Sequence, residues 1–198
     1  NGSPKSKGCT YTALKIIENE LINEGIEVKF YEVGNKPVIG CTGCTACRKL
    51  GKCVHDDLVN EVSKEIESAD GFIVGSPVHY AAASGAATSF LDKLFYSTDK
   101  NQLRHKFGAS IVSCRRGGAS ATFDQLNKYF TINEMPIVSS VYWNQIHGNT
   151  PEEVVQDLEG VRTMKVLARN MAYLIKCKEA AKNVPLPKLV PVERTNFI

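Results

Sequence analysis

Two patterns of apolar and polar positions alternate along this chain. Apolar residues spaced three or four positions apart predict helices that follow residues 10, 57, 84, 120 and 151. Short apolar or alternating runs predict strands at 26–33, 71–75, 109–113 and 136–143. Because helices and strands alternate, we expect βαβ units, a parallel sheet and helices on both of its faces.

Individual residues mark where several of these elements begin and end. Gly25 ends the first helix, Asp57 is a candidate N-cap for the second, and Pro151 suits a first helical turn. The apolar stripe of the last helix is Met164, Leu167, Ala168, Met171 and Ile175. From Pro185 onward, prolines predict an extended arm. We therefore expect one domain at 1–184, with a cysteine-rich insertion at 35–57, and a C-terminal arm at 185–198.

The loops that follow the predicted strands contain the unusual chemistry of the sequence. They span residues 1–10, 34–57, 76–84 and 113–122. A doubly wound sheet binds its ligand at the carboxyl ends of its strands, where the winding reverses, so we expect all four loops to form one site. The first loop has no strand before it in this sequence, and we expect a short apolar strand ahead of Asn1 to complete a five-stranded sheet.

Composition narrows the classes of function. With 198 residues, 43% hydrophobic and 23% charged, the chain suits a globular domain with a core. Its net charge of +3 comes from scattered basic residues, so we expect no nucleic acid as partner. No apolar run approaches the roughly 18 residues that cross a membrane. Four of the seven cysteines fall between positions 41 and 53, which predicts a metal or redox site in a reducing, cytoplasmic compartment.

The segment from Gly2 to Thr10 has the composition of a phosphate-binding loop. It offers hydroxyls, two lysines and a following helix whose first N–H groups are free to bind an anion. It has neither the order of a P-loop nor the G-x-G-x-x-G spacing of a dinucleotide fold. The equally weighted alternative is an ordinary helix start with Thr10 as its cap.

Three motifs together resemble those of NADPH-dependent FMN reductases, a flavodoxin-like family. The first is Asn1-Gly2-Ser3-Pro4-Lys5 with Gly8-Cys9-Thr10. The second is Gly75-Ser76-Pro77-Val78-His79-Tyr80, followed by Ser84-Gly85 and Phe90-Leu91-Asp92-Lys93. The third is Arg115-Arg116-Gly117-Gly118 with Phe123-Asp124-Gln125-Leu126. Cys9 stands where the family has Asn, and His79 where it has Tyr.

The resemblance implies a flavodoxin-like doubly wound parallel sheet of five strands with FMN bound at its edge. The residues implied for the phosphate are Ser3, Lys5, Gly8, Cys9 and Thr10. Those implied for the isoalloxazine ring are Pro77, Val78, His79 and Tyr80, and at its other edge Ser113, Cys114, Arg115, Gly117 and Gly118. His79 and Tyr80 are also candidate substrate contacts. The alternatives are a core role for Tyr80, a solvated loop for the arginines and a buried filler for Cys114.

Cys41-x2-Cys44-x2-Cys47-x5-Cys53 is the most specific motif of the chain. Closely spaced thiolates are soft ligands that suit iron–sulfur clusters. The spacing resembles that of iron–sulfur flavoproteins, which implies a [4Fe–4S] cluster beside FMN. A zinc ion and metal-free or disulfide-forming thiols stay open as alternatives.

The resemblance implies hydride transfer from NAD(P)H to FMN and electron release to a small-molecule acceptor or a redox partner protein. No side chain is expected to act as a nucleophile. One alternative is a non-enzymatic iron–sulfur flavoprotein that accepts electrons from ferredoxin. Another is a redox-sensing or metal-binding module in which FMN is structural. The families that the chain resembles form dimers or tetramers, so we expect a homodimer or homotetramer.

Overall fold

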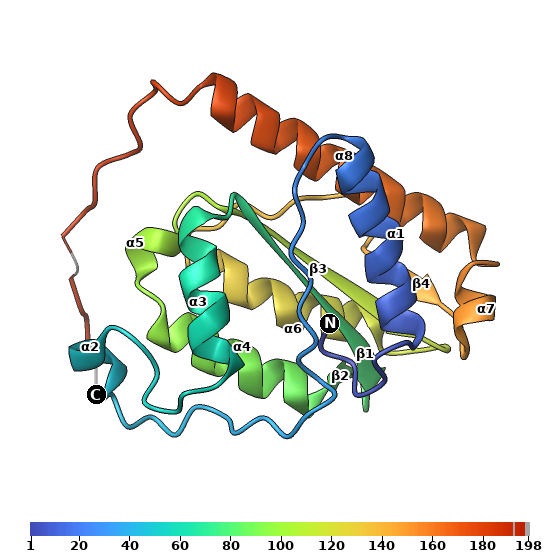
Figure 1. Cartoon of the computed structure of the whole chain (residues 1–198), viewed down its shortest axis with the longest axis horizontal. Coiled ribbons are helices and arrows are strands. Elements are labelled where there is room, and N and C mark those ends of the chain that lie inside the picture. The colour runs from blue at the N-terminus through green and yellow to red at the C-terminus, as the bar shows by residue number, and fades with distance from the viewer. Residues whose placement is uncertain (192, 197–198) are drawn as a thin grey trace.

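The computed structural model describes residues 1–191 and 193–196 and shows an α/β fold (Figure 1). Within this part of the chain the strands are β1 (Gly71–His79), β2 (Ala82–Ala83), β3 (Phe107–Cys114) and β4 (Gln145–His147), in the order β2-β1-β3-β4. β1, β3 and β4 run parallel to one another. β2 is antiparallel to β1, because it returns along β1 after a tight turn. The sheet is therefore mixed, not wholly parallel as expected.

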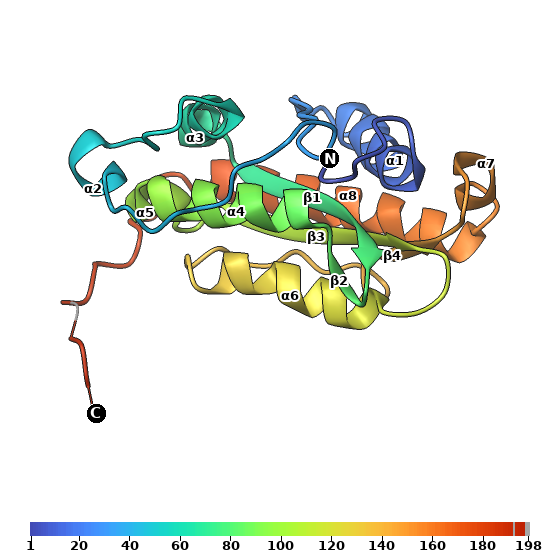
Figure 2. The same ribbon diagram turned by 90° about the horizontal axis from the view of Figure 1, so that it is seen from below.

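Two groups of helices enclose the sheet. The long helices are α1 (Cys9–Asn23), α3 (Leu58–Ser68), α4 (Gly85–Ser97), α6 (Ala119–Thr131) and α8 (Leu158–Ala180). The short ones are α2 (Cys47–Leu50), α5 (Lys100–Leu103) and α7 (Pro151–Val154). Apolar residues of α1 and α8 pack with β3 in one cluster, and those of α3, α4 and α6 form a second cluster with β1 and β3. Figure 2 shows α1 and α6 on opposite sides of the sheet.

The segment 26–33 is extended but forms no strand in the described structure, which corrects the prediction from its alternating pattern. Backbone hydrogen bonds hold it near both ends: Ile26 N donates to Leu21 O at 2.9 Å, the Asn1 amino group donates to Tyr31 O at 2.7 Å, and Val33 N donates to Asn1 O at 2.9 Å. A groove of about 610 Å³, lined largely by apolar side chains, separates it from β1. A strand needs a neighbouring ladder, and here that ladder does not form. The described residues form a four-stranded sheet, and the strand expected before Asn1 stays a prediction.

The predicted strand at 136–143 is also wrong. Residue Ile137 makes a single bridge to Gly108, after which the chain leaves the sheet. It is drawn toward α8 instead, because the Ser140 hydroxyl donates to Thr163 O at 2.7 Å and Asn170 Nδ2 donates to Ser139 O at 2.8 Å. The chain rejoins the sheet a few residues later as β4. The other two predicted strands are confirmed and lie within β1 and β3.

Most of the predicted helix boundaries are confirmed. The Asp57 carboxylate accepts from Val59 N at 3.0 Å and caps α3, and Pro151 is the first residue of α7. In α8, four of the five predicted stripe residues are buried, and Ile175 is half-buried. After α8 the chain has no helix or strand in residues 185–191 and 193–196, and residues 192, 197 and 198 of the predicted arm lie outside the described structure. None of the described helices is both long enough and apolar enough to cross a membrane.

Candidate functional site

Three loops meet where β1 and β3 end. Gly2 N donates to Gly75 O at 2.8 Å, which places the first loop beside the middle of β1. The Ser84 hydroxyl, which caps α4, donates to Gly2 O at 2.6 Å. Thr10 Oγ1 lies 2.7 Å from Ser113 Oγ and joins the start of α1 to the end of β3. The structure therefore brings loops 1–10, 76–84 and 113–122, three of the four expected to meet, to one edge of the sheet.

The first loop leaves the N-terminus of α1 without a side-chain cap among the described residues. Gly8 is the N-cap residue of α1, and within the described chain no side chain caps this helix. Ser3 is buried, and its hydroxyl accepts from Lys5 N at 3.1 Å, so the loop curls back over the helix start. The Lys5 side chain is exposed at the mouth of this turn. An uncapped helix N-terminus with a lysine beside it favours a phosphate group.

Thr10 is not the cap that the alternative interpretation required. It lies inside the first turn of α1, is buried, and forms a hydrogen bond with Ser113. Cys9 Sγ donates instead to Gly148 O at 3.6 Å, so the first turn of α1 also touches the segment after β4. Burial raises the pKa of the Cys9 thiol above its usual value. Both side chains thus link the start of α1 to the ends of β3 and β4.

The second loop carries backbone strain. Tyr80 and Ala81 have φ angles of 52° and 59°, a region that costs non-glycine residues energy. The Tyr80 side chain is fully exposed, which contradicts its alternative role as a core aromatic, and His79 is exposed as well. Pairing of Val78 with Ala83 in the β1–β2 hairpin holds the turn in this conformation. The loop therefore presents its two aromatic side chains to the outside of the sheet edge.

The third loop packs directly on the second. Gly118, the N-cap residue of α6, has a φ of +90°, and a Cβ there would lie 2.8 Å from Ala81 Cα. No side chain of the described residues caps α6, so its first N–H groups also face this edge. Arg115 and Arg116 are exposed, as is Gly117. The contact between the two loops requires a glycine at position 118.

A pairing between Cys114 and His147 lies beside this loop, and sequence reasoning missed it. Cys114 is buried, its Sγ lies 3.4 Å from His147 Nδ1, and burial raises the pKa of its thiol. His147 N donates to the Asp157 carboxylate at 2.7 Å, which fixes the end of β4. Burial agrees with Cys114 as a packed side chain. The sequence offered no clear signal for this pairing, because polar Asn144 and Gln145 separate His147 from the apolar residues before them.

The four cysteines of the loop 35–57 line one small hollow together with residues of α4. Cys41 and Cys44 are exposed, Cys47 Sγ donates to Tyr96 O at 3.8 Å, and Cys53 is buried. No disulfide joins the cysteines of the described chain. Four free thiols around one hollow fit a thiophilic metal or cluster as a donor set. Their side chains are not gathered as a closed shell, because no group of three His, Cys, Asp or Glu residues in positions 1–191 and 193–196 is arranged to hold a metal ion.

The cysteine hollow lies away from the sheet edge, which corrects the expectation of a single site. Ser84, at the edge, caps the N-terminus of α4, whereas Tyr96 and Ser97 at its C-terminus line the hollow. At 1.5 Å per residue, this helix separates the two places by about 19 Å. The loop runs alongside α4, with Gly40 next to Ser89 at mid-helix (Figure 1). Its length allowed it to leave the edge, which spacing in the sequence does not reveal.

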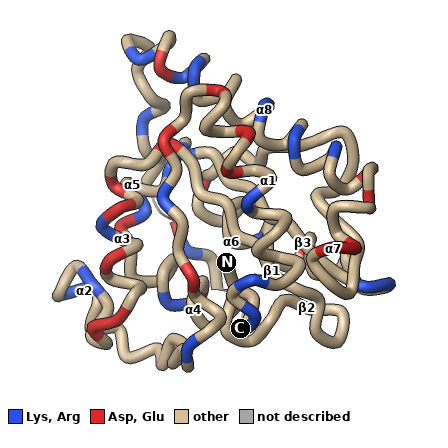
Figure 3. Tube along the Cα trace, turned by 45° about the vertical axis from the view of Figure 1, so that its right-hand side comes forward, with Lys and Arg blue, Asp and Glu red and all other residues tan. Residues whose placement is uncertain are grey.

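Charged side chains are dispersed over the molecule. Figure 3 shows Lys and Arg alternating with Asp and Glu on many helices and loops. Several lie in ion pairs, such as Arg169 with Glu20 at 2.6 Å and Arg104 with Glu134 at 2.7 Å. These pairs are on the surface, where each contributes little to stability.

Known proteins are similar to this chain in sequence and in fold. Residues 1–150 match the family of NADPH-dependent FMN reductases. An iron-sulfur flavoprotein of Methanocaldococcus jannaschii is 31% identical over 183 residues, covering 89% of this chain and 95% of its own length. A solved NADH:FMN oxidoreductase in its apo form has a TM-score of 0.61 at 14% identity, covering 89% of this chain and 86% of its own. A flavodoxin from the domain Archaea has a TM-score of 0.56 at 16% identity, with coverages of 87% and 92%.

These likenesses agree with the arrangement at the sheet edge. The two structural neighbours are similar in fold, and the family match spans all three loops that meet there. The resemblance drawn from the three sequence motifs is thereby confirmed. This chain belongs to the NADPH-dependent FMN reductase family of FMN-binding flavoprotein oxidoreductases, and it is similar over most of its length to an iron-sulfur flavoprotein.

Proposed function

We propose that this chain binds FMN at the edge formed by loops 1–10, 76–84 and 113–122 and transfers electrons between NAD(P)H and an acceptor. Bound FMN supplies one- and two-electron redox chemistry that no protein side chain offers. The observation that carries the proposal is the uncapped N-terminus of α1, next to the Thr10–Ser113 contact that joins two of the loops. The chain's own task is to anchor, orient and shield the cofactor.

The phosphate is assigned to the first loop. The free N–H groups at the start of α1 bind its oxygens, with Ser3, Gly8, Cys9 and Thr10 shaping the loop around them. Lys5 adds a positive charge from the exposed side. Because Thr10 and Ser113 already share one hydrogen bond, one of the two hydroxyls retains a free donor or acceptor position for the ligand.

The ring system is assigned to the other two loops. The turn from Pro77 to Tyr80 provides backbone N–H groups and two exposed aromatic side chains. Ser113 and Cys114 end β3, open space surrounds Gly117, and Gly118 lets this loop pack closely on Ala81. Arg115 and Arg116 place positive charge beside this loop, which favours an anionic form of a bound group. His79 and Tyr80 are positioned to contact a substrate that stacks there.

The cysteine loop is proposed to hold a [4Fe–4S] cluster through Cys41, Cys44, Cys47 and Cys53. A cluster of this type supplies single-electron exchange. Support comes from the soft donor set around one hollow and from the iron-sulfur flavoprotein name of the 31% identical relative. The exposure of Cys41 and Cys44 places the hollow within reach of a partner protein.

Selective loss of phosphate recognition tests the FMN site. Apo-protein is titrated with FMN and with riboflavin, and flavin fluorescence reports binding. We expect wild-type protein to bind FMN more tightly than riboflavin. Lys5→Glu should weaken FMN binding by about tenfold and leave riboflavin binding unchanged. Lys7→Glu is the matched control, since Lys7 is exposed in the same loop but is not assigned to the phosphate. Equal affinity of the wild type for both flavins would refute the proposed phosphate site.

The acceptor distinguishes two modes of action. The alternative is an electron carrier that accepts electrons from ferredoxin, favoured by the surface position of the cysteine hollow. Anaerobic NADH and NADPH oxidation by the FMN-loaded protein is measured with quinone and free flavin as acceptors, and reduction of the bound flavin by reduced ferredoxin is measured in a separate assay. Turnover with a small acceptor supports the reductase, whereas flavin reduction by ferredoxin alone supports the carrier. We also propose that the protein forms a homodimer or homotetramer and is located in the reducing cytoplasm.

A further inference from the structure

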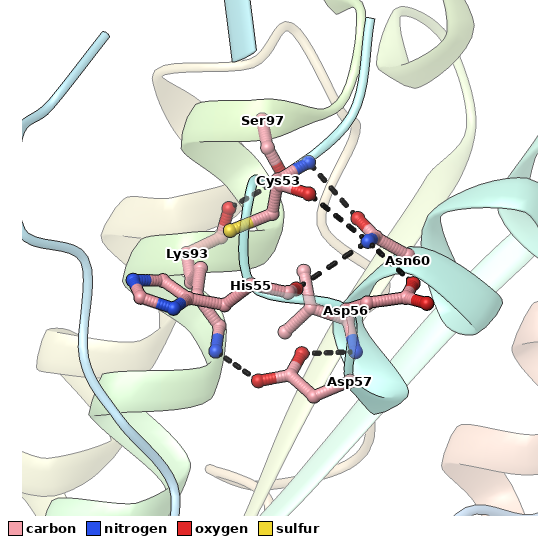
Figure 4. A network of polar contacts seen from close by, with 8 residues as sticks. Cys53, His55, Asp56, Asp57, Asn60, Lys93 and Ser97 are labelled. Atoms are coloured by element: carbon pink, nitrogen blue, oxygen red, sulfur yellow. Dashed lines mark hydrogen bonds and ion pairs between the residues drawn. The ribbon is translucent and has the colours of Figure 1, made fainter. Parts of the chain in front are cut away.

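The side chain of Asn60 forms two hydrogen bonds with the backbone of Cys53 (Figure 4). Cys53 N donates to Asn60 Oδ1 at 2.9 Å, and Asn60 Nδ2 donates to Cys53 O at 3.0 Å. The same Nδ2 lies 3.4 Å from His55 O, two residues further along. Because the side-chain amide of Asn60 binds both the backbone N–H and the backbone C=O of Cys53, the backbone at Cys53 is fixed relative to α3.

The part of α3 that carries Asn60 is itself anchored to the core. One oxygen of Asp57 accepts from Val59 N and caps the helix, and the other accepts from Lys93 Nζ on α4. The Lys93 side chain is only 1% exposed, so α4 presents this ammonium group from the interior. Val59, in the same turn of α3, is 1% exposed and packs in the core. Cys53 is therefore tied through Asn60 and α3 to the rigid body of the protein.

The other cysteines of the hollow lack such an attachment. Cys41 and Cys44 are exposed and lie in a segment without helix or strand. Cys47 begins the single-turn helix α2 and touches α4 through its thiol, a hydrogen bond that is lost when the thiol is deprotonated to bind metal. The hollow thus has one cysteine with a fixed backbone and three that have to be brought together around a ligand.

We propose that Asn60 is a positioning residue of the cysteine site, which preorganises Cys53 as the ligand onto which Cys41, Cys44 and Cys47 close. This inference rests on the proposed metal-binding role of the loop. Groups that orient metal ligands from outside the ligand shell commonly contribute 10–100-fold in metal affinity. Without these hydrogen bonds, the backbone of Cys53 has to be ordered when metal binds. The entropy cost of that ordering makes the binding free energy less favourable.

Cobalt binding by reduced apo-protein tests the inference. Co²⁺ is titrated under anaerobic conditions, and the thiolate-to-cobalt absorption reports occupancy of the cysteine loop. We expect Asn60→Ala to weaken Co²⁺ binding by about 10–100-fold. Asn60→Asp keeps an acceptor for Cys53 N–H but loses the donor to Cys53 O. Its affinity for Co²⁺ is therefore expected to lie between that of the wild type and that of Asn60→Ala.

Asn101→Ala is the matched control. Asn101 also lies in the first turn of a helix, two residues after a capping aspartate, and its side chain donates to Asp99 at 3.2 Å. It does not line the hollow. We expect this variant to bind Co²⁺ as the wild type does.

Two further measurements separate positioning from general folding. In the metal-free protein, alkylation of buried Cys53 is expected to be faster in Asn60→Ala than in the wild type, while FMN affinity stays unchanged. Parallel losses of melting temperature, FMN affinity and Co²⁺ affinity would indicate a general structural role and overturn the inference. Wild-type Co²⁺ affinity in Asn60→Ala would overturn it while the metal-binding loop stands. A wild-type protein that binds no Co²⁺ would overturn both.

Discussion

Thr10 and Ser113 share a buried hydrogen bond, with 2.7 Å between their hydroxyl oxygens. It joins the first turn of α1 to the end of β3, although 103 positions separate the two residues in sequence. We expect Thr10→Val to lower the free energy of unfolding by about 1–2 kcal/mol, because it leaves the Ser113 hydroxyl buried without a partner. Urea unfolding of the apo-protein measures the loss.

A double variant shows whether the effects of the two hydroxyls on stability are coupled. Thr10→Val with Ser113→Ala removes both partners, so its loss should be smaller than the sum of the two single losses. Additive losses would show that the two hydroxyls do not depend on each other.

The ion pair between Lys93 and Asp57 predicts an asymmetric response to mutation. Asp57→Asn keeps a good N-cap for α3 but leaves the buried ammonium of Lys93 without its carboxylate, which should cost about 3 kcal/mol of stability. Lys93→Met removes the buried charge itself and should cost much less. Thermal and urea unfolding of both variants decide the point. A larger loss for Lys93→Met would mean that packing of the lysine stem, not its charge, dominates.

Gly118 and the neighbouring Gly117 form a matched pair for the contact between the two ring-side loops. Gly118→Ala puts a Cβ 2.8 Å from Ala81 Cα at a φ of +90°, and we expect a loss of about 2 kcal/mol together with weaker FMN binding. Gly117 has open space around it in the described structure, so Gly117→Ala should be close to neutral for stability. Melting temperatures of the apo-proteins and FMN titrations provide the comparison, and equal behaviour of the two variants would contradict the predicted contact.

The buried thiol of Cys114 predicts a pH dependence. Burial raises its pKa above the ordinary value, which is about 8.5 in unfolded chains. Since the thiolate is the reactive form, alkylation of Cys114 in native protein should reach half its limiting rate at a higher pH than in urea. Peptide mass spectrometry after timed alkylation follows this residue among the seven cysteines.

The same shift affects stability. A thiol with a raised pKa in the folded state contributes stability that is fully present below the unfolded pKa and is lost as the pH rises through the folded value. The unfolding free energy of the wild type should therefore decline more steeply above about pH 8.5 than that of Cys114→Ala. Parallel curves for the two proteins would show that the thiol titrates alike in both states.

The sequence predicted those elements whose signals are local. β1 and β3 are short apolar runs buried on both faces, and such runs form strands wherever a sheet is available. Asp57 at the start of α3 and Pro151 at the start of α7 act on backbone groups within three residues of themselves. The three loop motifs likewise indicated the family, because their residue types suit a phosphate and a flavin at one sheet edge.

Pairing over long distances was decided only by the folded chain. The alternating pattern at 26–33 and the apolar residues at 136–143 both favour strands, yet the first segment lies across a groove from β1 and the second turns toward α8. Sequence spacing also could not place the cysteine loop at the far end of α4, or show that Asn60 holds Cys53. Local chemistry sets which conformations and ligands a segment favours, whereas a strand, a thiol–imidazole pair or a fixed ligand exists only once a distant partner occupies the adjoining space.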